Sequence, residues 1–196
     1  MARFVLLFKK MANLILASSS ARRKELLEQV GLSFDMFSPD VDESVRADEL
    51  IDTYVKRLAE AKAQAILTEF PNATVIAADT SLSLDGQIIG KPESKQHAFD
   101  IWTALSGRQH QVFSGVYVAN ANKIISCVVA THVSFQCLSH TEMEKYWATG
   151  EPVGKAGGYA IQGYAAQFIP AIIGSYSNVV GLPLYETLQL LAEFQN

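Results

Sequence analysis

Cysteine is scarce in this chain of 196 residues, which contains only Cys127 and Cys137, with nine residues between them. Two thiols at this separation form neither a disulfide framework nor a C-x-x-C metal site. We therefore expect both to be buried free thiols in a reducing compartment, which favours a cytoplasmic protein. The four histidines show no H-x-x-x-H or H-E-x-x-H spacing, so a zinc site built on histidine is not expected.

Long hydrophobic runs and a surplus of basic residues are also absent. The apolar run Phe4–Phe8 is closed by Lys9 and Lys10. It is shorter than a secretory signal or a membrane span, which need at least about 7 and about 20 apolar residues. Sixteen basic against 20 acidic residues give a net charge of −4, unlike a protein that coats nucleic acid. We expect no membrane and no nucleic-acid polymer as partners, although a pocket for a phosphorylated ligand stays open.

Several familiar nucleotide-binding and nucleophile motifs are missing too. The chain has no G-x-G-x-x-G and no G-x-S-x-G sequence. The segment from Gly86 to Pro92 resembles a P-loop, but it is one residue short and ends on proline instead of the serine or threonine that would hold magnesium. These absences count against a Rossmann enzyme, an α/β-hydrolase and a P-loop kinase.

What the chain contains is an ordinary globular composition, with 49% apolar and 18% charged residues. From Asn13 onward, strand-like and helix-like segments alternate, and Asp85-Gly86 is a hairpin signal. We predict helices over residues 21–30, 48–70, 94–105, 141–148 and from about 183, and strands over 14–17, 34–37, 74–78, 81–84, 111–118 and 123–135, followed by short strands. This order predicts one α/β domain over residues 13–196, with a mixed sheet and flanking helices, after an N-terminal extension over 1–12.

Basic residues begin the first predicted helix, where Arg22, Arg23 and Lys24 follow three serines at 18–20. Cations in a first turn oppose the helix dipole by about 0.3–1 kcal/mol each. Side chains that bend back to acidic neighbours would explain this pattern without a ligand. The alternative is a phosphate cradle made of the serine turn, the helix amides and the arginines.

Two charged residues interrupt apolar patterns. Lys62 lies in the apolar stripe of the longest predicted helix, so it either reaches the edge of the core or meets a buried negative charge. The predicted strand 74–78 ends at Asp79, and in α/β folds the carboxyl ends of strands open onto the ligand crevice. A buried acid there needs a cation, a metal or a proton, unless it only caps a turn. Asp42-Glu43 in the preceding loop are candidate partners around a hard cation, or solvated loop charges.

Glycines surround two further lysines. Residues 150–163 contain five glycines and Lys155, and they would let the backbone approach a ligand closely. Lys91 stands between Gly90 and Pro92, which indicates a rigidly placed ammonium group. Neither segment is specific on its own.

Taken in order, these segments resemble the Maf family of nucleoside triphosphate pyrophosphatases. The resemblance spans about residues 13–194 and rests on Leu16–Leu27, Val41–Glu43, Ala59–Ala63, Ala78–Thr80, Gly90–Pro92, Lys155–Gly163, Gly174–Tyr176 and Val179–Leu184. It implies a mixed α/β fold of the kind shared with inosine triphosphatases, with two lobes around a nucleotide-binding cleft. The chain departs from the family in having Ala21 where proline is common and Gly154 where many relatives carry aspartate.

The resemblance implies metal-dependent hydrolysis of the α–β phosphoanhydride of a nucleoside triphosphate, which gives a monophosphate and pyrophosphate. The Ala-Ile-Gln-Gly and Gly-Ser-Tyr stretches resemble the branch acting on dTTP and UTP, rather than the branch acting on 7-methyl-GTP. Removal of unwanted nucleotides is the implied role. The alternatives are a nucleotide-binding regulator of cell division or septum formation without turnover, and a structural module without a ligand. A homodimer stays open.

The resemblance also implies roles for single residues. Asp79 matches the proposed general base, and Arg22, Thr80 and Gln162 match positions associated with substrate choice. We expect Glu43 and Asp79 to hold the divalent cation, Mg²⁺ or Mn²⁺. The residues expected to bind substrate are Ser18, Arg22, Arg23, Lys62, Thr80, Lys91, Lys155 and Gln162.

Overall fold

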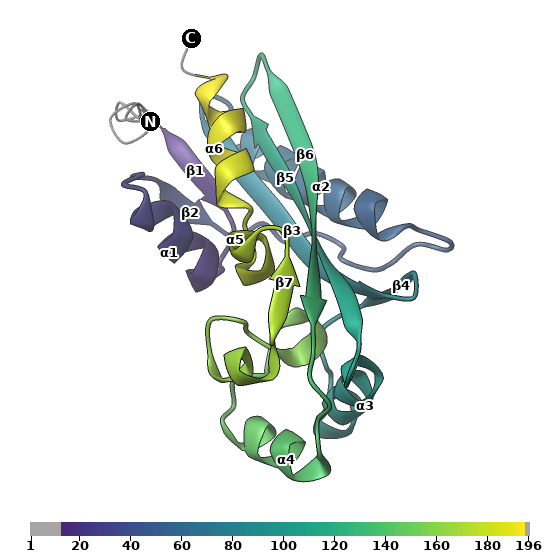
Figure 1. The fold of residues 1–196 in the computed structure, drawn as a ribbon. Coiled ribbons are helices and arrows are strands. Elements are labelled where there is room, and N and C mark those ends of the chain that lie inside the picture. The colour runs from purple at the N-terminus through teal and green to yellow at the C-terminus, as the bar shows by residue number, and fades with distance from the viewer. Residues whose placement is uncertain (1–12, 195–196) are drawn as a thin grey trace.

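The computed structural model describes residues 13–194 (Figure 1). The predicted N-terminal extension over residues 1–12 lies outside the described residues. The strands are β1 (Leu14–Ala17), β2 (Asp35–Phe37), β3 (Thr74–Leu84), β4 (Gln87–Ile89), β5 (Gln109–Ala119), β6 (Ile124–Ser134) and β7 (Ala171–Ile173). The helices are α1 (Ala21–Gln29), α2 (Ile51–Glu69), α3 (Lys95–Leu105), α4 (His140–Ala148), α5 (Tyr176–Val180) and α6 (Leu184–Ala192), with short 3₁₀ helices η1 (Ala156–Gly158) and η2 (Tyr164–Phe168).

The strands form one mixed sheet in the order β2-β1-β3-β5-β6-β7, with β4 paired to β3 as a hairpin. Strand β1 runs parallel to both of its neighbours, β2 and β3. The pairs β3–β5, β5–β6 and β6–β7 are antiparallel. The predicted mixed α/β sheet with flanking helices is therefore confirmed.

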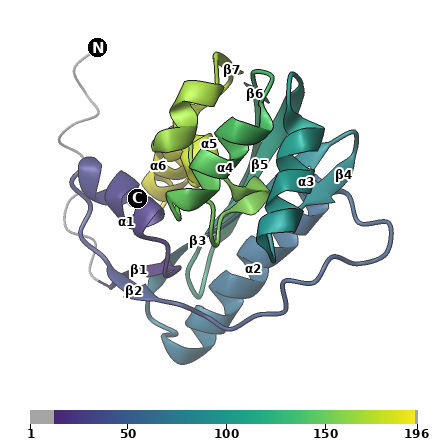
Figure 2. The ribbon, with the colours of Figure 1, turned by 90° about the horizontal axis from the view of Figure 1, so that it is seen from below.

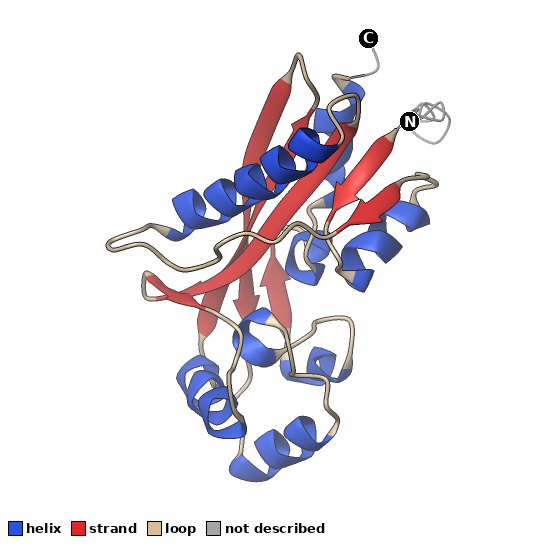
Figure 3. Ribbon diagram, turned by 180° about the vertical axis from the view of Figure 1, so that it is seen from behind, coloured by secondary structure: helices blue, strands red, loops and turns tan. Residues whose placement is uncertain are grey.

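Side chains on alternate sides of the central strands form two separate cores. Leu16 and Ile76 pack with residues of α1, α5 and α6 on one side of the sheet. Ile15 and Val75 pack with α2 on the other side. Figures 1 and 3 show these two sides, with α2 behind the sheet in Figure 1 and in front of it in Figure 3. Because successive strand residues point to opposite sides, each side chain of β3 belongs to one of these two environments.

A second lobe lies at the far end of the long strands (Figures 1 and 2). Helices α3 and α4 and the two 3₁₀ helices gather there around an apolar core of their own. Trp102, Tyr146 and Phe168 are nearly inaccessible at its centre. The two lobes implied by the resemblance are present, and the long strands β5 and β6 run from one into the other.

Strand β3 differs from the sequence prediction, because it is one strand of 11 residues that passes through Asp79. The expectation that the strand ends at Asp79 is wrong. Strand β5 pairs with β3 without interruption, and Asp79 lies opposite Gly115. Strand β1, however, ends at Ala17, and its last pairing with β3 joins Leu16 to Ile76. Asp79 therefore lies beyond the end of its parallel neighbour although it is in the middle of its own strand.

Helix α2 packs directly on the backbone of β5. A Cβ atom added at Gly115 would lie 2.4 Å from the carbonyl oxygen of Val55, a distance that real Cβ atoms do not show. Glycine is therefore required for this approach. The contact sets the height of α2 above the sheet, and with it the position of every side chain that α2 turns toward β3.

The expectation of two buried thiols is wrong in part, because Cys127 is half-buried and Cys137 is exposed; both are free. The C-terminal part also contains the short helix α5 where only strands were expected. Within residues 13–194, no helix is both long and apolar enough to cross a membrane.

Candidate active site

A cavity of about 360 Å³ opens between the two lobes, beside the end of β1. Its walls come from the start of α1, the loop after β2, helix α2, strand β3, the loop after β4, residues 154–162 and residues 179–181. All ten residues predicted to form the site line this one cavity: Ser18, Arg22, Arg23, Glu43, Lys62, Asp79, Thr80, Lys91, Lys155 and Gln162. The structure thus brings them together, while the role of each remains a prediction.

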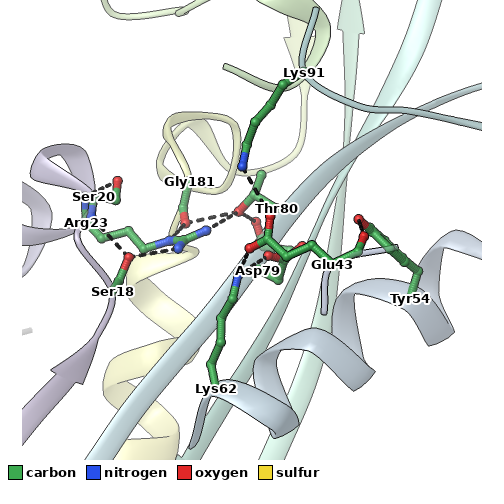
Figure 4. A network of polar contacts seen from close by, with 11 residues as sticks. Ser18, Ser20, Arg23, Glu43, Tyr54, Lys62, Asp79, Thr80, Lys91 and Gly181 are labelled. Carbon is green, nitrogen blue, oxygen red and sulfur yellow. Dashed lines mark hydrogen bonds and ion pairs between the residues drawn. The ribbon is translucent and has the colours of Figure 1, made fainter. Parts of the chain in front are cut away.

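Lys62 connects two carboxylates at the base of the cavity (Figure 4). Its ammonium lies 2.6 Å from Asp79 Oδ1 and 2.7 Å from Glu43 Oε1. Lys62 and Asp79 are each 8% exposed, so the apolar stripe of α2 does contain a buried cation facing a buried acid. Lys91, on the other lobe, reaches the second oxygen of Glu43 at 3.2 Å. Glu43 therefore bridges two lysines from different lobes.

The charge of Glu43 follows from these contacts. Partial burial by itself would raise the pKa of this carboxyl group. The hydrogen bond and charge of Lys62, together with those of Lys91, outweigh burial and hold the pKa of Glu43 below its usual value. Glu43 is therefore a carboxylate at neutral pH and presents a negative charge to the cavity.

Arg23 lies in the first turn of α1, and three hydrogen-bond acceptors fix its guanidinium group. Ser20 caps this helix, and its hydroxyl accepts from the Arg23 backbone N–H. The Arg23 guanidinium donates to Ser18 Oγ at 3.0 Å and to the Gly181 carbonyl oxygen at 2.8 Å. It also donates to Thr80 Oγ1 at 3.3 Å. The serine turn, β3 and the loop after α5 thus position one guanidinium between them.

The three cationic side chains of the first turn point in different directions and have different partners. Arg22 turns into the cavity wall and donates to the Val180 carbonyl oxygen at 3.3 Å. Lys24 points outward to Glu28, at 3.7 Å, as the interpretation without a ligand expected. Burial lowers the pKa values of Arg22 and Arg23, because each charge has lost part of its hydration. A bound anion would compensate that loss.

Behind Thr80 lies a polar network that the sequence did not reveal. The Thr80 hydroxyl lies 2.7 Å from Ser114 Oγ on β5 and donates to the Gly181 carbonyl oxygen at 3.1 Å. Ser114 is fully buried, and its hydroxyl oxygen lies 3.4 Å from the Asn178 carbonyl oxygen. Nothing in the strand pattern of the sequence distinguishes Ser114. Only the register of β3 and β5, which pairs Ser114 with Thr80, identifies it as part of this network.

The glycine-rich segment brings Lys155 to the opposite wall. Its ammonium donates to the backbone carbonyl oxygens of Glu151 and Val153. Burial, and then the charge of Arg22, lowers the pKa of Lys155. Gly154 has a φ of 72°, in the left-handed region. In this chain, backbone carbonyl groups hold Lys155. Gly154 occupies the preceding position, where many relatives were expected to have an aspartate.

The donor set suits a cation that arrives with phosphate. Within the described part of the chain, no group of three or more His, Cys, Asp or Glu side chains is placed to hold a metal ion. Glu43 and Asp79 supply two carboxylates to the cavity lining, and both contact Lys62. Magnesium is commonly bound by one or two carboxylates together with substrate phosphate oxygens and water. The residues present fit that kind of site.

Known proteins resemble this chain over nearly its whole length. A dTTP/UTP pyrophosphatase of Acinetobacter baylyi is 67% identical to this chain and covers 90% of it and 96% of its own length. A dTTP/UTP pyrophosphatase of Vibrio parahaemolyticus is 48% identical, with coverage of 95% and 99%. The solved Ham1 protein of Staphylococcus aureus covers 94% of this chain and 98% of its own at 14% identity, with a TM-score of 0.46, too distant to carry an assignment. Residues 13–194 match the family described as Maf-like protein, and the chain belongs to that family.

Proposed function

We propose that this protein hydrolyses dTTP and UTP between the α and β phosphates, releasing the nucleoside monophosphate and pyrophosphate. The observation that carries the proposal is the buried Asp79 carboxylate at the base of a cavity whose other charged side chains are mainly cations. Relatives that cover almost the whole chain bear the name of this activity. The two free thiols and the net charge of −4 suit a cytoplasmic enzyme that acts on small molecules.

The cationic side chains bind the triphosphate. Five of them line the cavity with only two carboxylates: Arg22, Arg23, Lys62, Lys91 and Lys155 against Glu43 and Asp79. Ser18 and the amides at the start of α1 add hydrogen-bond donors. Arginine guanidinium groups can take phosphate oxygens in pairs, and the lysines act as point charges. This arrangement neutralises the negative charge that otherwise repels an attacking water.

Asp79 removes a proton from that water. The new bond forms between the water oxygen and phosphorus, the bridging P–O bond breaks, and pyrophosphate leaves with the bonding electrons. Lys62 engages Oδ1 of Asp79, so the second carboxylate oxygen is the one left to accept the proton. The sheet and α2 keep the carboxylate away from bulk solvent. Its interaction with the attacking water is stronger in this sheltered site than it would be in bulk solvent.

Glu43 and Asp79 would hold a divalent cation, Mg²⁺ or Mn²⁺, in part through water molecules, together with the phosphate oxygens. When bound, this cation supplies further charge neutralisation on the phosphates. Gln162 and Thr80 read the pyrimidine, and the Gln162 amide offers both a donor and an acceptor for its edge. Gln162 is exposed at the rim and Thr80 is half-buried.

A direct assay tests the proposal. The purified protein is incubated with dTTP, UTP, CTP and 7-methyl-GTP in the presence of Mg²⁺, and monophosphate and pyrophosphate are measured together. We expect equal amounts of both products, with dTTP and UTP preferred, and no reaction when a chelator is added. Binding of dTTP, seen as a thermal shift, without pyrophosphate release would contradict the proposal and favour a nucleotide-binding regulator.

A further inference from the structure

Residues 38–50 connect β2 to α2 without any helix or strand, and they carry Glu43 to the cavity. Figure 3 shows this loop crossing the sheet on the side of α2. A connection of this length without secondary structure is uncommon in a small domain and is usually functional. Since the Glu43 carboxylate meets Lys62 and Lys91 at 2.7 and 3.2 Å, something must hold its backbone in place.

Two residues of α2 hold the backbone on consecutive carbonyl groups. The Tyr54 hydroxyl donates to the Glu43 carbonyl oxygen at 2.9 Å (Figure 4). The Arg57 guanidinium donates to the Ser44 carbonyl oxygen, also at 2.9 Å. Tyr54 and Arg57 are three residues apart, so they share one face of the helix. Two consecutive peptide groups, those that begin with the Glu43 and Ser44 carbonyls, are thus each bonded to α2.

Arg57 is itself fixed. Its Nε and Nη2 atoms donate to the two oxygens of Glu49 at 2.6 and 2.7 Å, and its guanidinium lies over the Tyr54 ring, 5.5 Å from the centroid. The side chains of Arg57 and Glu49 are only 18% and 5% exposed. The hydrogen bonds from Arg57 lower the pKa of Glu49 to about 2, so the pair stays ionised at every pH at which the enzyme is expected to work.

We propose that Tyr54 and Arg57 are positioning residues, which fix Glu43 at the cavity before a nucleotide arrives. This inference rests on the proposed function and deepens it. Neither residue lines the cavity, so each acts on the substrate and its cation only through Glu43. Partners of this kind around metal-binding carboxylates typically contribute 10–100-fold to activity or metal affinity. Preorganisation is the reason, because a loop free to move would have to be ordered during each turnover.

A double-mutant cycle separates positioning from a general effect on folding. We expect Tyr54→Phe and Arg57→Lys each to lower kcat/KM for dTTP by about 10–100-fold. Lysine keeps the charge but loses the planar fork with which Arg57 donates to both oxygens of Glu49 and to the Ser44 carbonyl oxygen. In a Glu43→Gln background the same changes should lower kcat/KM no further. Losses of equal size in both backgrounds would overturn the inference.

Arg108→Ala is the matched control, because Arg108 also pairs with a carboxylate through two contacts, to Asp85 at 2.7 and 2.8 Å, but outside the cavity. It should leave kcat/KM unchanged. A second readout needs no turnover: amide hydrogen exchange of residues 42–46 in the free protein should become faster in Tyr54→Phe and Arg57→Lys but not in Arg108→Ala. Unchanged exchange would overturn the inference. If the wild-type chain releases no pyrophosphate, the proposed function fails, and exchange alone decides the positioning role.

Discussion

The Lys62 ammonium and the Asp79 carboxylate lie 2.6 Å apart, between the helix α2 and the strand β3 that pack against each other. Each residue is 8% exposed, and Lys62 compensates the charge of Asp79, while Lys62 itself also pairs with Glu43 at 2.7 Å. Removing one member of a buried ion pair typically costs about 3–5 kcal/mol, because the remaining charge is left without compensation. This buried ion pair lies inside a packed interface and faces the cavity on one side. The candidate site is arranged around it.

Asp79→Asn should abolish turnover while leaving the fold intact. Asparagine has the same size and keeps an oxygen that can accept from Lys62, but it cannot take a proton from water. Loss of a general base typically costs 10²–10⁴-fold, and we expect a fall in kcat of at least about 100-fold. Pyrophosphate release from dTTP measures it, with circular dichroism as the check on folding. Asp85→Asn, at the exposed end of the same hairpin, is the control. Near-normal hydrolysis by the Asp79 variant would contradict the base assignment.

Arg22→Ala should raise KM and lower kcat together. Its guanidinium lines the cavity, and a hydrogen bond to a charged group contributes about 1.5–3 kcal/mol, so kcat/KM should fall by about 10–100-fold. Lys24→Ala tests the neighbouring cation, which pairs outward with Glu28 and should be silent. Steady-state kinetics with dTTP compare the two variants. Equal effects from both would show that only overall surface charge matters.

Gln162→Ala should change the preference among dTTP, UTP and CTP. The amide can match the donors and acceptors on a pyrimidine edge, and one hydrogen bond of this kind is worth about 0.5–1.5 kcal/mol. The ratios of kcat/KM should therefore shift by about 2–10-fold. Gln167→Ala, an exposed glutamine outside the cavity, should leave the ratios unchanged. The same loss on all three nucleotides would mean that Gln162 does not select the base.

His110 should make the free energy of unfolding depend on pH. It is 2% exposed, its Nε2 lies 2.7 Å from the Tyr159 hydroxyl, and burial lowers its pKa from 6.5 to about 4. Between these values the unfolded chain binds a proton that the folded chain excludes. Stability from this group is therefore complete above pH 6.5 and is lost as pH falls toward 4, by at most about 1.4 kcal/mol per pH unit.

Denaturant unfolding of the wild type and of His110→Gln, measured from pH 7 to pH 4.5, checks this expectation. Glutamine keeps a hydrogen-bonding group but does not titrate, so the slope should be smaller in the variant. Parallel curves for the wild type and His110→Gln would contradict a buried neutral imidazole.

Apart from the short helix α5, the helices and most strand positions could be predicted from the sequence because their apolar patterns are strong. Strand β3 is the exception. An acid after four apolar residues is typical of a strand end, and only the unbroken ladder with β5 shows that the strand continues through Asp79. The exposure of Cys137 could not be predicted either, because the sequence does not show where the apolar stretch around this thiol becomes accessible to solvent.

The candidate site was found where charge interrupts an apolar pattern. Lys62 and Asp79 stood out for that reason, and the structure brings them into contact. Tyr54 and Ser114 gave no such signal, since an aromatic residue on the buried face of a helix and a serine in a strand are ordinary features of a core. Their importance depends on what lies across from them, which a linear sequence does not show.

Asp79 and Thr80 are consecutive in β3, so their side chains emerge on opposite sides of the sheet, toward α2 and toward the loop after α5. Evolution can therefore remodel the surroundings of the hydroxyl, including Ser114 and Gly181, while the acid and its lysine stay untouched. A single-residue insertion earlier in β3, by contrast, would exchange the two sides at once. With the roles proposed for these two residues, the fold permits divergence in the nucleotide that is recognised more readily than divergence in the reaction.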